Sequence, residues 1–275
     1  MTSSLTTSGK PLWSVLVSSF DDNCDLWPIF FHFLFKQWPD IPTPVYLVTN
    51  FRTYDDPRVV SLCVGKDVSW GDTMTKALEK IPSKHVWMLL EDFFITHPLL
   101  TSHIDQIVRS WDALGGKYLE TGRQSEIGEL VPGTDFRHIP AENPQAGINS
   151  AFYECELLRS LAQPGRNLWQ ANSQLKRLNL DNHPDFYYLR EGVPPMIQFV
   201  EAVKGKFWKP AAMEFMQETG LPLDLWWRPF PPQGQTFLPK LVRSFHKRRI
   251  EWRKRRDEKR FAAGVVSPPV FPLRA

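Results

Sequence analysis

The chain has 275 residues, 42% hydrophobic and 23% charged, which is enough to bury a sizeable globular core. Three widely spaced cysteines without a CxxC pair exclude a disulfide framework and a cysteine zinc site, and the polar start lacks the order of a signal peptide. The cysteine usage suits a reducing compartment, and no apolar run approaches the roughly 20 residues of a membrane span, so we expect a cytoplasmic protein.

Alternating apolar runs and polar breaks predict a strand–helix–strand unit at the start, followed by two more strands. Strand, helix and strand at this spacing form a right-handed parallel crossover. The predicted elements are strands over 13–19, 44–50 and 59–64, helices over 26–37 and 70–80, and a fourth strand from His85.

The second half continues the pattern less regularly. Helices are predicted over 99–114, 152–161, 169–180 and 209–218, strands over 186–189 and 197–200, and short strands with a loop over 115–147. The fold class is therefore α/β, with a mostly parallel central sheet flanked by helices and an appended basic C-terminal helix. We divide the chain into a disordered leader (1–10), one α/β domain (11–228), a linker (229–237) and a tail with the basic helix (238–275).

The most informative motif is the pair Glu91-Asp92 at the end of the apolar run 85–90. A continuous apolar run is typical of a strand buried on both faces, and carboxylates are rarely buried without a partner. Acids at the carboxyl end of such a strand lie where open α/β sheets hold ligands. Mg²⁺ or Mn²⁺ needs only one or two protein carboxylates when a diphosphate supplies other oxygens. The alternative is a strand that ends in acids facing solvent.

Short polar side chains follow the first two strands. Ser18 and Ser19 end the first predicted strand, Asp21 follows it, and Asn50 ends the second strand. At adjacent strand ends these groups can hydrogen-bond a base or ribose, although ordinary turn chemistry explains them equally well. The absence of GxGxxG and GxxxxGK[ST] disfavours a dinucleotide site and a P-loop.

Other motifs narrow the chemistry. Lys204 and Lys206 flank a glycine, and their two positive charges can bind phosphate. The alternative is a basic turn exposed to solvent. The seven histidines lack HxxxH and HExxH spacing and no GxSxG elbow is present, so a zinc hydrolase and a serine hydrolase are disfavoured.

Three segments carry a family resemblance: SSFDDNCDLWPIFFHFLFKQWPD, then PVYLVTN, then SWGDTMTKALEKIPSKHVWMLLEDFFI. In this order they resemble bacterial GT-A-type glycosyltransferases of surface-polysaccharide biosynthesis. The resemblance covers residues 12–100 well and continues more weakly through INSAFYECELLRSLAQPGRNLW and VEAVKGKFW to about residue 210.

This resemblance implies transfer of a sugar from a nucleotide-diphosphate donor to a glycan or lipid-linked glycan acceptor. It places a divalent metal, Mn²⁺ or Mg²⁺, and the donor diphosphate on Glu91 and Asp92. The nucleotide-sugar would also meet Ser18, Ser19, Asp21, Asn50, Trp70, Asp72, Trp169, Lys204 and Lys206.

The chain departs from the family pattern at Trp169. Relatives carry an acid just after this tryptophan, a natural base for the acceptor hydroxyl, whereas Gln170, Ala171 and Asn172 follow here. Either another acid serves, or the mechanism is retaining, or activity is weak or altered. The candidate acids are Asp21, Asp72, Glu154, Glu156 and Asp181.

The tail concentrates positive charge. Residues 240–260 hold eleven Lys/Arg and three acids, while the rest of the chain holds 22 basic and 27 acidic residues. An amphipathic helix over 238–260 can lie on an anionic membrane surface, bind a partner, or dock on its own domain. A non-catalytic module docking through this helix is therefore the alternative function, and nucleic acid is a less favoured partner.

Overall fold

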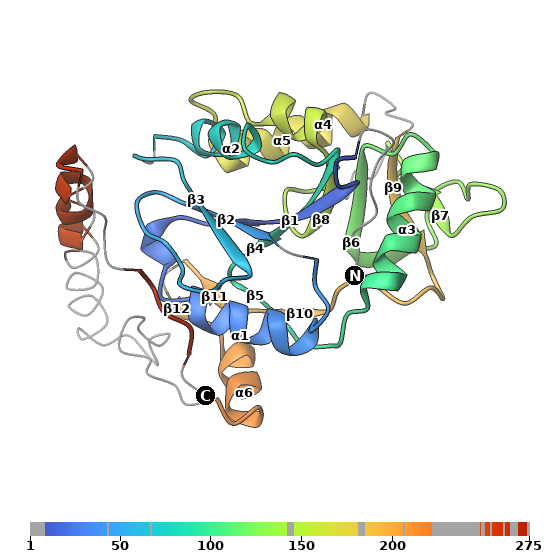
Figure 1. The fold of residues 1–275 in the computed structure, drawn as a ribbon. Helices are drawn as coiled ribbons and strands as arrows, with labels where there is room; N and C mark the ends of the chain where they lie inside the picture. Colours follow the sequence, from blue (N-terminus) through green and yellow to red (C-terminus); the bar gives the residue numbers. More distant parts are fainter. Residues whose placement is uncertain are drawn as a thin grey trace, which may run out of the picture.

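The computed structural model shows a central sheet between two layers of helices (Figure 1). The structure describes residues 9–42, 44–66, 68–141, 146–180, 185–205, 207–221, 248, 251–253, 255–260, 262–264 and 269–273. Lys206, Asp181, the predicted linker and most of the predicted leader and tail lie outside these residues.

The main sheet has eight strands in the order β3-β2-β1-β4-β8-β6-β9-β7. The strands are β1 Trp13–Ser18, β2 Val45–Thr49, β3 Val59–Cys63, β4 His85–Leu90, β6 Tyr118–Ser125, β7 Phe136–His138, β8 Ala151–Glu154 and β9 Phe186–Arg190. Four neighbouring pairs are parallel, and β7 and β8 run against their neighbours. The α/β class and the mostly parallel sheet are confirmed.

Helices cover both faces of this sheet. They are α1 Trp27–Gln37, α2 Trp70–Leu78, α3 Thr101–Ala113, α4 Cys155–Leu161, α5 Leu168–Leu180 and α6 Pro210–Glu218. One core contains buried side chains of α1, α3 and α6, and the other contains those of α2, α4 and α5. The second layer lies along the top of Figure 1.

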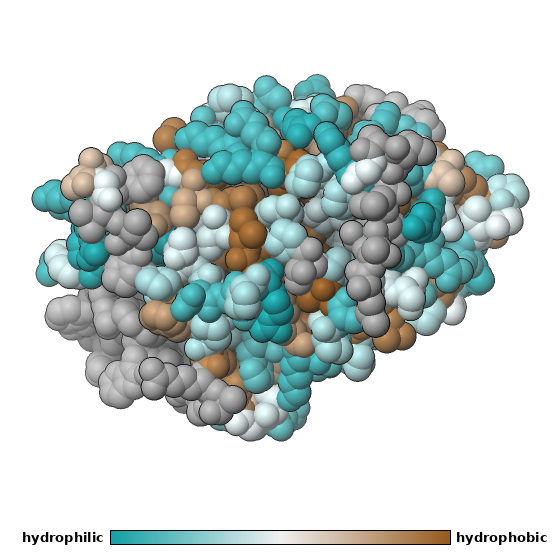
Figure 2. Space-filling view, in the orientation of Figure 1, coloured by the Kyte–Doolittle hydropathy of each residue, from teal (hydrophilic) through white to brown (hydrophobic). Residues whose placement is uncertain are grey.

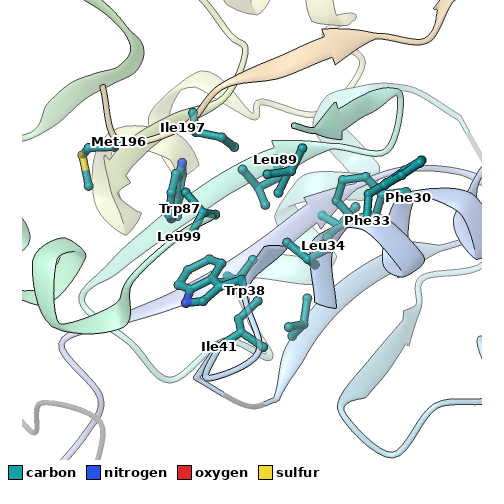
Figure 3. Close-up of a cluster of buried hydrophobic side chains, with 14 of the residues drawn as sticks. Phe30, Phe33, Leu34, Trp38, Ile41, Trp87, Leu89, Leu99, Met196 and Ile197 are labelled. Atoms are coloured by element: carbon teal, nitrogen blue, oxygen red, sulfur yellow. The ribbon is translucent and has the colours of Figure 1, made fainter. Parts of the chain in front are cut away.

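Aromatic side chains fill the core on the α1 side (Figure 3). Trp38 lies next to Trp87 with ring centroids 5.4 Å apart, and both are fully buried. Trp38 also donates from Nε1 to Thr101 Oγ1 at 2.8 Å, which satisfies its polar atom. This packing fixes α1, which follows the polar end of β1, and β4, which ends at the acid pair.

The strand order reverses between β1 and β4. The chain passes from β1 to β2 and β3 on one side, and then crosses back through α2 to β4 on the other side of β1. The carboxyl ends of β1 and β4 therefore diverge at a topological switch point, where open α/β sheets form a crevice.

Two small two-stranded sheets, apart from the main sheet, are formed by the strand that follows the acid pair and by strands of the second half of the chain. β5 Phe93–Ile95 pairs with β10 Phe199–Glu201, and β11 Val203–Lys204 pairs with β12 Phe207–Trp208. The predicted strand over 197–200 thus begins two residues later. The Lys204-Gly205 turn belongs to the second hairpin, and Gly205 has φ +62°, which glycine adopts readily.

The predicted helix over 152–161 is wrong at its start. Residues 151–154 form β8, which lies between β4 and β6, and the helix begins only at Cys155. The short apolar run Ala151-Phe152-Tyr153 fits either element by pattern, and its pairing with Val86 to Met88 decides for strand.

The C-terminal segment returns to the body. Residues 251–253 and 255–260 are helical, and Val270 forms a bridge with Tyr54 beside α1. The helix lies at the far left of Figure 1. We call residues 251–253 and 255–260 the C-terminal helix.

One face of the molecule is shown in Figure 2. Hydrophilic residues dominate over the α2, α4 and α5 layer, and hydrophobic residues are visible in the middle of this face, below that layer. Within the described part of the chain, no helix combines the length and apolarity needed to cross a bilayer.

Candidate functional site

A cavity of about 350 Å³ lies at the switch point. The carboxyl ends of β1 and β4 form two of its walls, and the first turn of α2 and the start of α5 contribute the others. Its lining residues are Ser18, Ser19, Phe20, Asn23, Trp70, Thr73, Leu90, Glu91, Asp92 and Leu168. The structure therefore brings together five predicted site residues from three separate segments.

The acid pair follows β4 directly, as predicted. Glu91 is buried, and Asn23 donates a hydrogen bond from Nδ2 to its Oε1. Asp92 is partly exposed, and its backbone oxygen accepts from Ala202 N at 2.6 Å. The Glu91 carboxylate is thus positioned by the turn after β1, whereas the backbone of Asp92 is held by the residue that follows β10.

The serines close the β1 wall. Ser19 Oγ accepts a hydrogen bond from Trp27 Nε1 at 2.8 Å, which ties the end of β1 to the first turn of α1. A hydroxyl that accepts from a tryptophan retains its own hydrogen as a donor. Ser18 lies at the last position of β1 and pairs in register with Leu90 on β4.

The α2 wall contributes two buried polar atoms, one from the predicted site residue Trp70 and one from Thr73, which the sequence analysis did not consider. Thr73 is only 7% exposed, and its Oγ1 is buried without a hydrogen-bond partner among the described residues. Trp70 Nε1 is likewise buried and unpartnered within the described chain. Buried polar groups normally have partners, so a cavity wall with two such groups is suited to a polar ligand.

Asp21 and Asn50 line a separate, smaller cavity of about 150 Å³ with Asp22, Phe51, Lys66, Arg253, Asp257 and Glu258. Asp21 accepts from the backbone N–H groups of Asn50 and Phe51 at 2.9 and 3.1 Å, and Asn50 Oδ1 accepts from Asp21 N at 3.0 Å. These bonds join the ends of β1 and β2. Burial raises the pKa of Asp21, although the backbone donors and Arg52 act in the opposite direction.

The structure does not bring Asp72 or Trp169 to the large cavity. Asp72 caps α2 together with Ser69 and accepts from Gly165 N at 2.9 Å, and the hydrogen bond with Ser69 is the main reason that its pKa is lowered. Trp169 is 78% exposed on α5, and its neighbour Leu168 lines the cavity instead.

Lys204 is exposed on β11 and is not among the residues that line the large cavity. It follows Ala202, which bonds Asp92, by two residues, or roughly 7 Å of extended chain. Its predicted companion Lys206 lies outside the described residues.

The acids considered as a general base occupy other places. Glu154 pairs in register with His85, at the opposite end of β4 from Glu91, and Glu156 forms an ion pair with Arg159. Asp181 lies outside the described residues. Among the described residues, Glu91 and Asp92 are the only carboxylates that line the large cavity.

The residues could hold a hard cation only with help from a ligand. No group of three or more metal-ligating side chains exists in the described ranges. Glu91 and Asp92 supply carboxylate oxygens, which Mg²⁺ and Mn²⁺ prefer, and these ions commonly take their remaining oxygens from phosphate and water. The donor set therefore fits a metal bound together with a diphosphate.

Sequence reasoning missed Asn23 and Arg253. Asn23 stands in the predicted polar turn, but its contact with Glu91 crosses 68 residues of chain. Arg253 reaches Asp21 from 232 residues away. Neither contact leaves a local pattern in the sequence.

No protein-family model and no curated protein matches the sequence. Among solved structures, the chain is similar to S. aureus TarS 1-349 in complex with UDP, at 15% identity and TM-score 0.44, over 66% of this chain and 58% of that one. The same protein with UDP-GlcNAc matches at 15% identity and TM-score 0.39, over 67% and 60%.

A third match is CMP:2-keto-3-deoxy-manno-octonic acid synthetase complexed with CTP, at 14% identity and TM-score 0.41, over 76% of this chain and 98% of that one. The chain spans 58–60% of the TarS 1-349 structures named above.

Proposed function

We propose that this protein is a glycosyltransferase that moves a sugar from a nucleotide-diphosphate donor to a glycan acceptor. The observation that carries the proposal is the position of the large cavity. It lies at the carboxyl ends of β1 and β4, at the reversal of strand order, and Glu91 and Asp92 form one wall. Ligands of open α/β sheets bind at this place.

The walls of the cavity suit different parts of such a donor. Glu91 and Asp92 would hold Mg²⁺ or Mn²⁺ together with the diphosphate, and a bound cation would neutralise charge that develops on the leaving diphosphate. Lys204, which lies on β11 outside the cavity wall, would have to extend toward the bound donor to meet the same phosphates. Ser18, Trp70 and Thr73 could donate hydrogen bonds to the sugar hydroxyls. For the acceptor, we expect a glycan or a lipid-linked glycan.

Calorimetric titration tests donor binding. UDP-, GDP-, CMP- and dTDP-sugars are titrated with and without Mn²⁺, and we expect one nucleotide to bind more tightly with the metal. Asp92→Asn should weaken that binding by about 10- to 100-fold, because it removes a charged oxygen from the metal and diphosphate site. Glu218→Gln, on the exposed end of α6, is the matched control. Unchanged binding by Asp92→Asn would remove the role assigned to this acid.

The second candidate is a non-catalytic module that docks on an anionic membrane through the C-terminal helix. The outward side of this helix carries Trp252, which is 63% exposed, and the exposed residues Arg255 and Lys259. An exposed tryptophan among basic residues is typical of interfacial helices.

Sedimentation with phosphatidylserine vesicles separates the two candidates. A docking module should pellet with the vesicles, lose binding as salt rises, and lose it with Trp252→Ala. Trp169→Ala is the matched control, since this tryptophan is also exposed but lies on α5. Sugar transfer without vesicle binding would contradict the second candidate, and vesicle binding without any nucleotide binding would contradict the first.

A further inference from the structure

The C-terminal helix packs across the carboxyl ends of β1 and β2 through ionic contacts. Arg52 donates to Asp257 Oδ2 from Nε at 2.9 Å and from Nη2 at 2.7 Å, and Asp257 is 2% exposed in its side chain. Arg256 contacts the other oxygen of Asp257 at 3.1 Å. A buried, doubly hydrogen-bonded ion pair fixes orientation, because removing either partner leaves a charge without compensation.

A second contact joins this helix to the turn that follows β1. Arg253 donates from Nη2 to the backbone oxygen of Asp21 at 2.9 Å, and the same nitrogen lies 4.0 Å from Asp22 Oδ1. The Arg253 side chain is 12% exposed, so solvent screens this contact little. The guanidinium therefore holds the first two residues of the 3₁₀ turn Asp21–Asn23.

The third residue of the same turn reaches the acid pair. Asn23 Nδ2 donates to Glu91 Oε1 in the large cavity. The turn also separates the two cavities, since Phe20 and Asn23 line the larger one and Asp21 and Asp22 line the smaller one. A three-residue turn cannot move at one end without moving the other, because its backbone is hydrogen-bonded from Asn23 N to Phe20 O at 3.0 Å.

We propose that the C-terminal helix is a structural part of the donor site, and that Arg253 is a positioning residue which orients Glu91 through the Asp21–Asn23 turn. The inference rests on the proposed function. It adds the C-terminal helix, which is not part of the sheet, to the residues that shape the donor site. Arg253 need not touch the donor; it holds the turn so that the Asn23 amide meets the carboxylate.

The test measures binding of UDP, GDP, CMP and dTDP, each with Mn²⁺, by calorimetry to the full chain and five variants. Arg253→Ala should lower the affinity for the nucleotide that the wild type prefers by about tenfold, the size of one typical charge-assisted hydrogen bond. Arg253→Lys keeps the charge without the planar fork and should fall between the two. Arg255→Ala, exposed on the same helix, should bind like the wild type.

Coupling separates positioning from a general loss of stability. Asn23→Ala alone should weaken binding, and adding Arg253→Ala to it should cause almost no further loss, because both residues act on Glu91 through one turn. Urea unfolding identifies any variant that does not fold. If Arg253→Ala does not fold, the nucleotide affinity of Arg253→Lys is compared with that of the wild type instead.

The outcomes distinguish the two levels of the proposal. Wild-type binding that survives Arg253→Ala and Arg253→Lys unchanged overturns the role of Arg253 and leaves the proposed function standing. Fully additive losses in the double variant overturn the connection through Asn23. Failure of the wild type to bind any of the nucleotides overturns the proposed function and this inference together.

Discussion

Individual residues in this protein are fixed by hydrogen bonds between distant segments. Glu91 is held by Asn23, the Asp21 carboxylate by the backbone of Asn50 and Phe51, and Ser19 by Trp27. Each bond joins the end of one strand to another element. The polar strand ends are therefore preorganised, which limits the ordering cost when a ligand binds.

A buried histidine at the other end of β4 predicts a pH dependence of stability. His85 is fully buried, and burial lowers its pKa from 6.5 despite the hydrogen bond to Asp112. Below its ordinary pKa, the unfolded chain therefore binds a proton that the folded chain resists, and stability falls as pH decreases.

Replacing this imidazole should flatten the profile. We expect His85→Gln to lose less stability than the wild type between about pH 7.5 and about pH 5.5, as measured by urea unfolding at several pH values. His97→Gln, at an exposed position, should keep the wild-type slope. An equally steep slope for His85→Gln would contradict the assignment.

At the scale of elements, the start of α2 is held against the loop before α5. Gly71 N donates to Arg166 O at 2.8 Å, and a Cβ added at Gly71 would lie 1.9 Å from the backbone oxygen of Gln163. The contact fixes the turn that carries Trp70 and Thr73 into the cavity wall. Only glycine permits this close approach.

Gly71→Ala should therefore destabilise the protein by about 1–3 kcal/mol, as overpacking does, although alanine in a helix is normally favoured over glycine by about 1 kcal/mol. Chemical denaturation measures the change. Gly147→Ala is the control, since its added Cβ would meet nothing closer than 3.5 Å. A stabilised Gly71→Ala protein would show that the loop moves away freely.

The local pattern predicted the elements of the first half well for a physical reason. Each apolar run there is bounded by polar or proline-containing breaks, and burial on both faces of β1 and β4 leaves the run uninterrupted. β8 was missed because Ala151–Glu154 continues into α4 without a breaker. Pairing with β4 and β6 determines its structure, and that pairing is not a local property.

The candidate site divides in the same way. Glu91 and Asp92 were predicted because they follow β4 directly, and Ser18 because it ends β1, since the carboxyl ends of parallel strands meet at one edge of a sheet. Trp169 was grouped with them by resemblance, yet its ring lies on the surface. Thr73 faces the cavity from a helix whose pattern indicates only amphipathicity, so nothing in the sequence marked it.

At the scale of the whole molecule, the C-terminal segment closes the structure on itself. The Arg52–Asp257 pair and the bridge between Tyr54 and Val270 connect it to the region after β2 at two points. The C-terminal helix therefore docks on its own domain, which was one of the alternatives that the sequence left open. Only the outward side of the helix is left for a membrane or a partner.

Removing one charge of the buried pair should loosen this closure. We expect Asp257→Asn to lower the stability of the docked segment by about 3–5 kcal/mol, because Arg52 would remain buried without its counter-charge. Limited proteolysis should then cut near the C-terminus faster than in the wild type. Asp135→Asn, in the exposed pair with Arg190, should change stability by about 0–1 kcal/mol. Equal protease resistance of all three proteins would contradict the closure.

The most direct test of the central claim is a crystal structure of the protein soaked with Mn²⁺ and the nucleotide-sugar selected by titration. The account predicts a diphosphate and a metal between the end of β1 and the Glu91-Asp92 pair, with the metal on Asp92 or Glu91 oxygens. A nucleotide bound elsewhere on the molecule, or a cavity without ligand at saturating nucleotide, would contradict it.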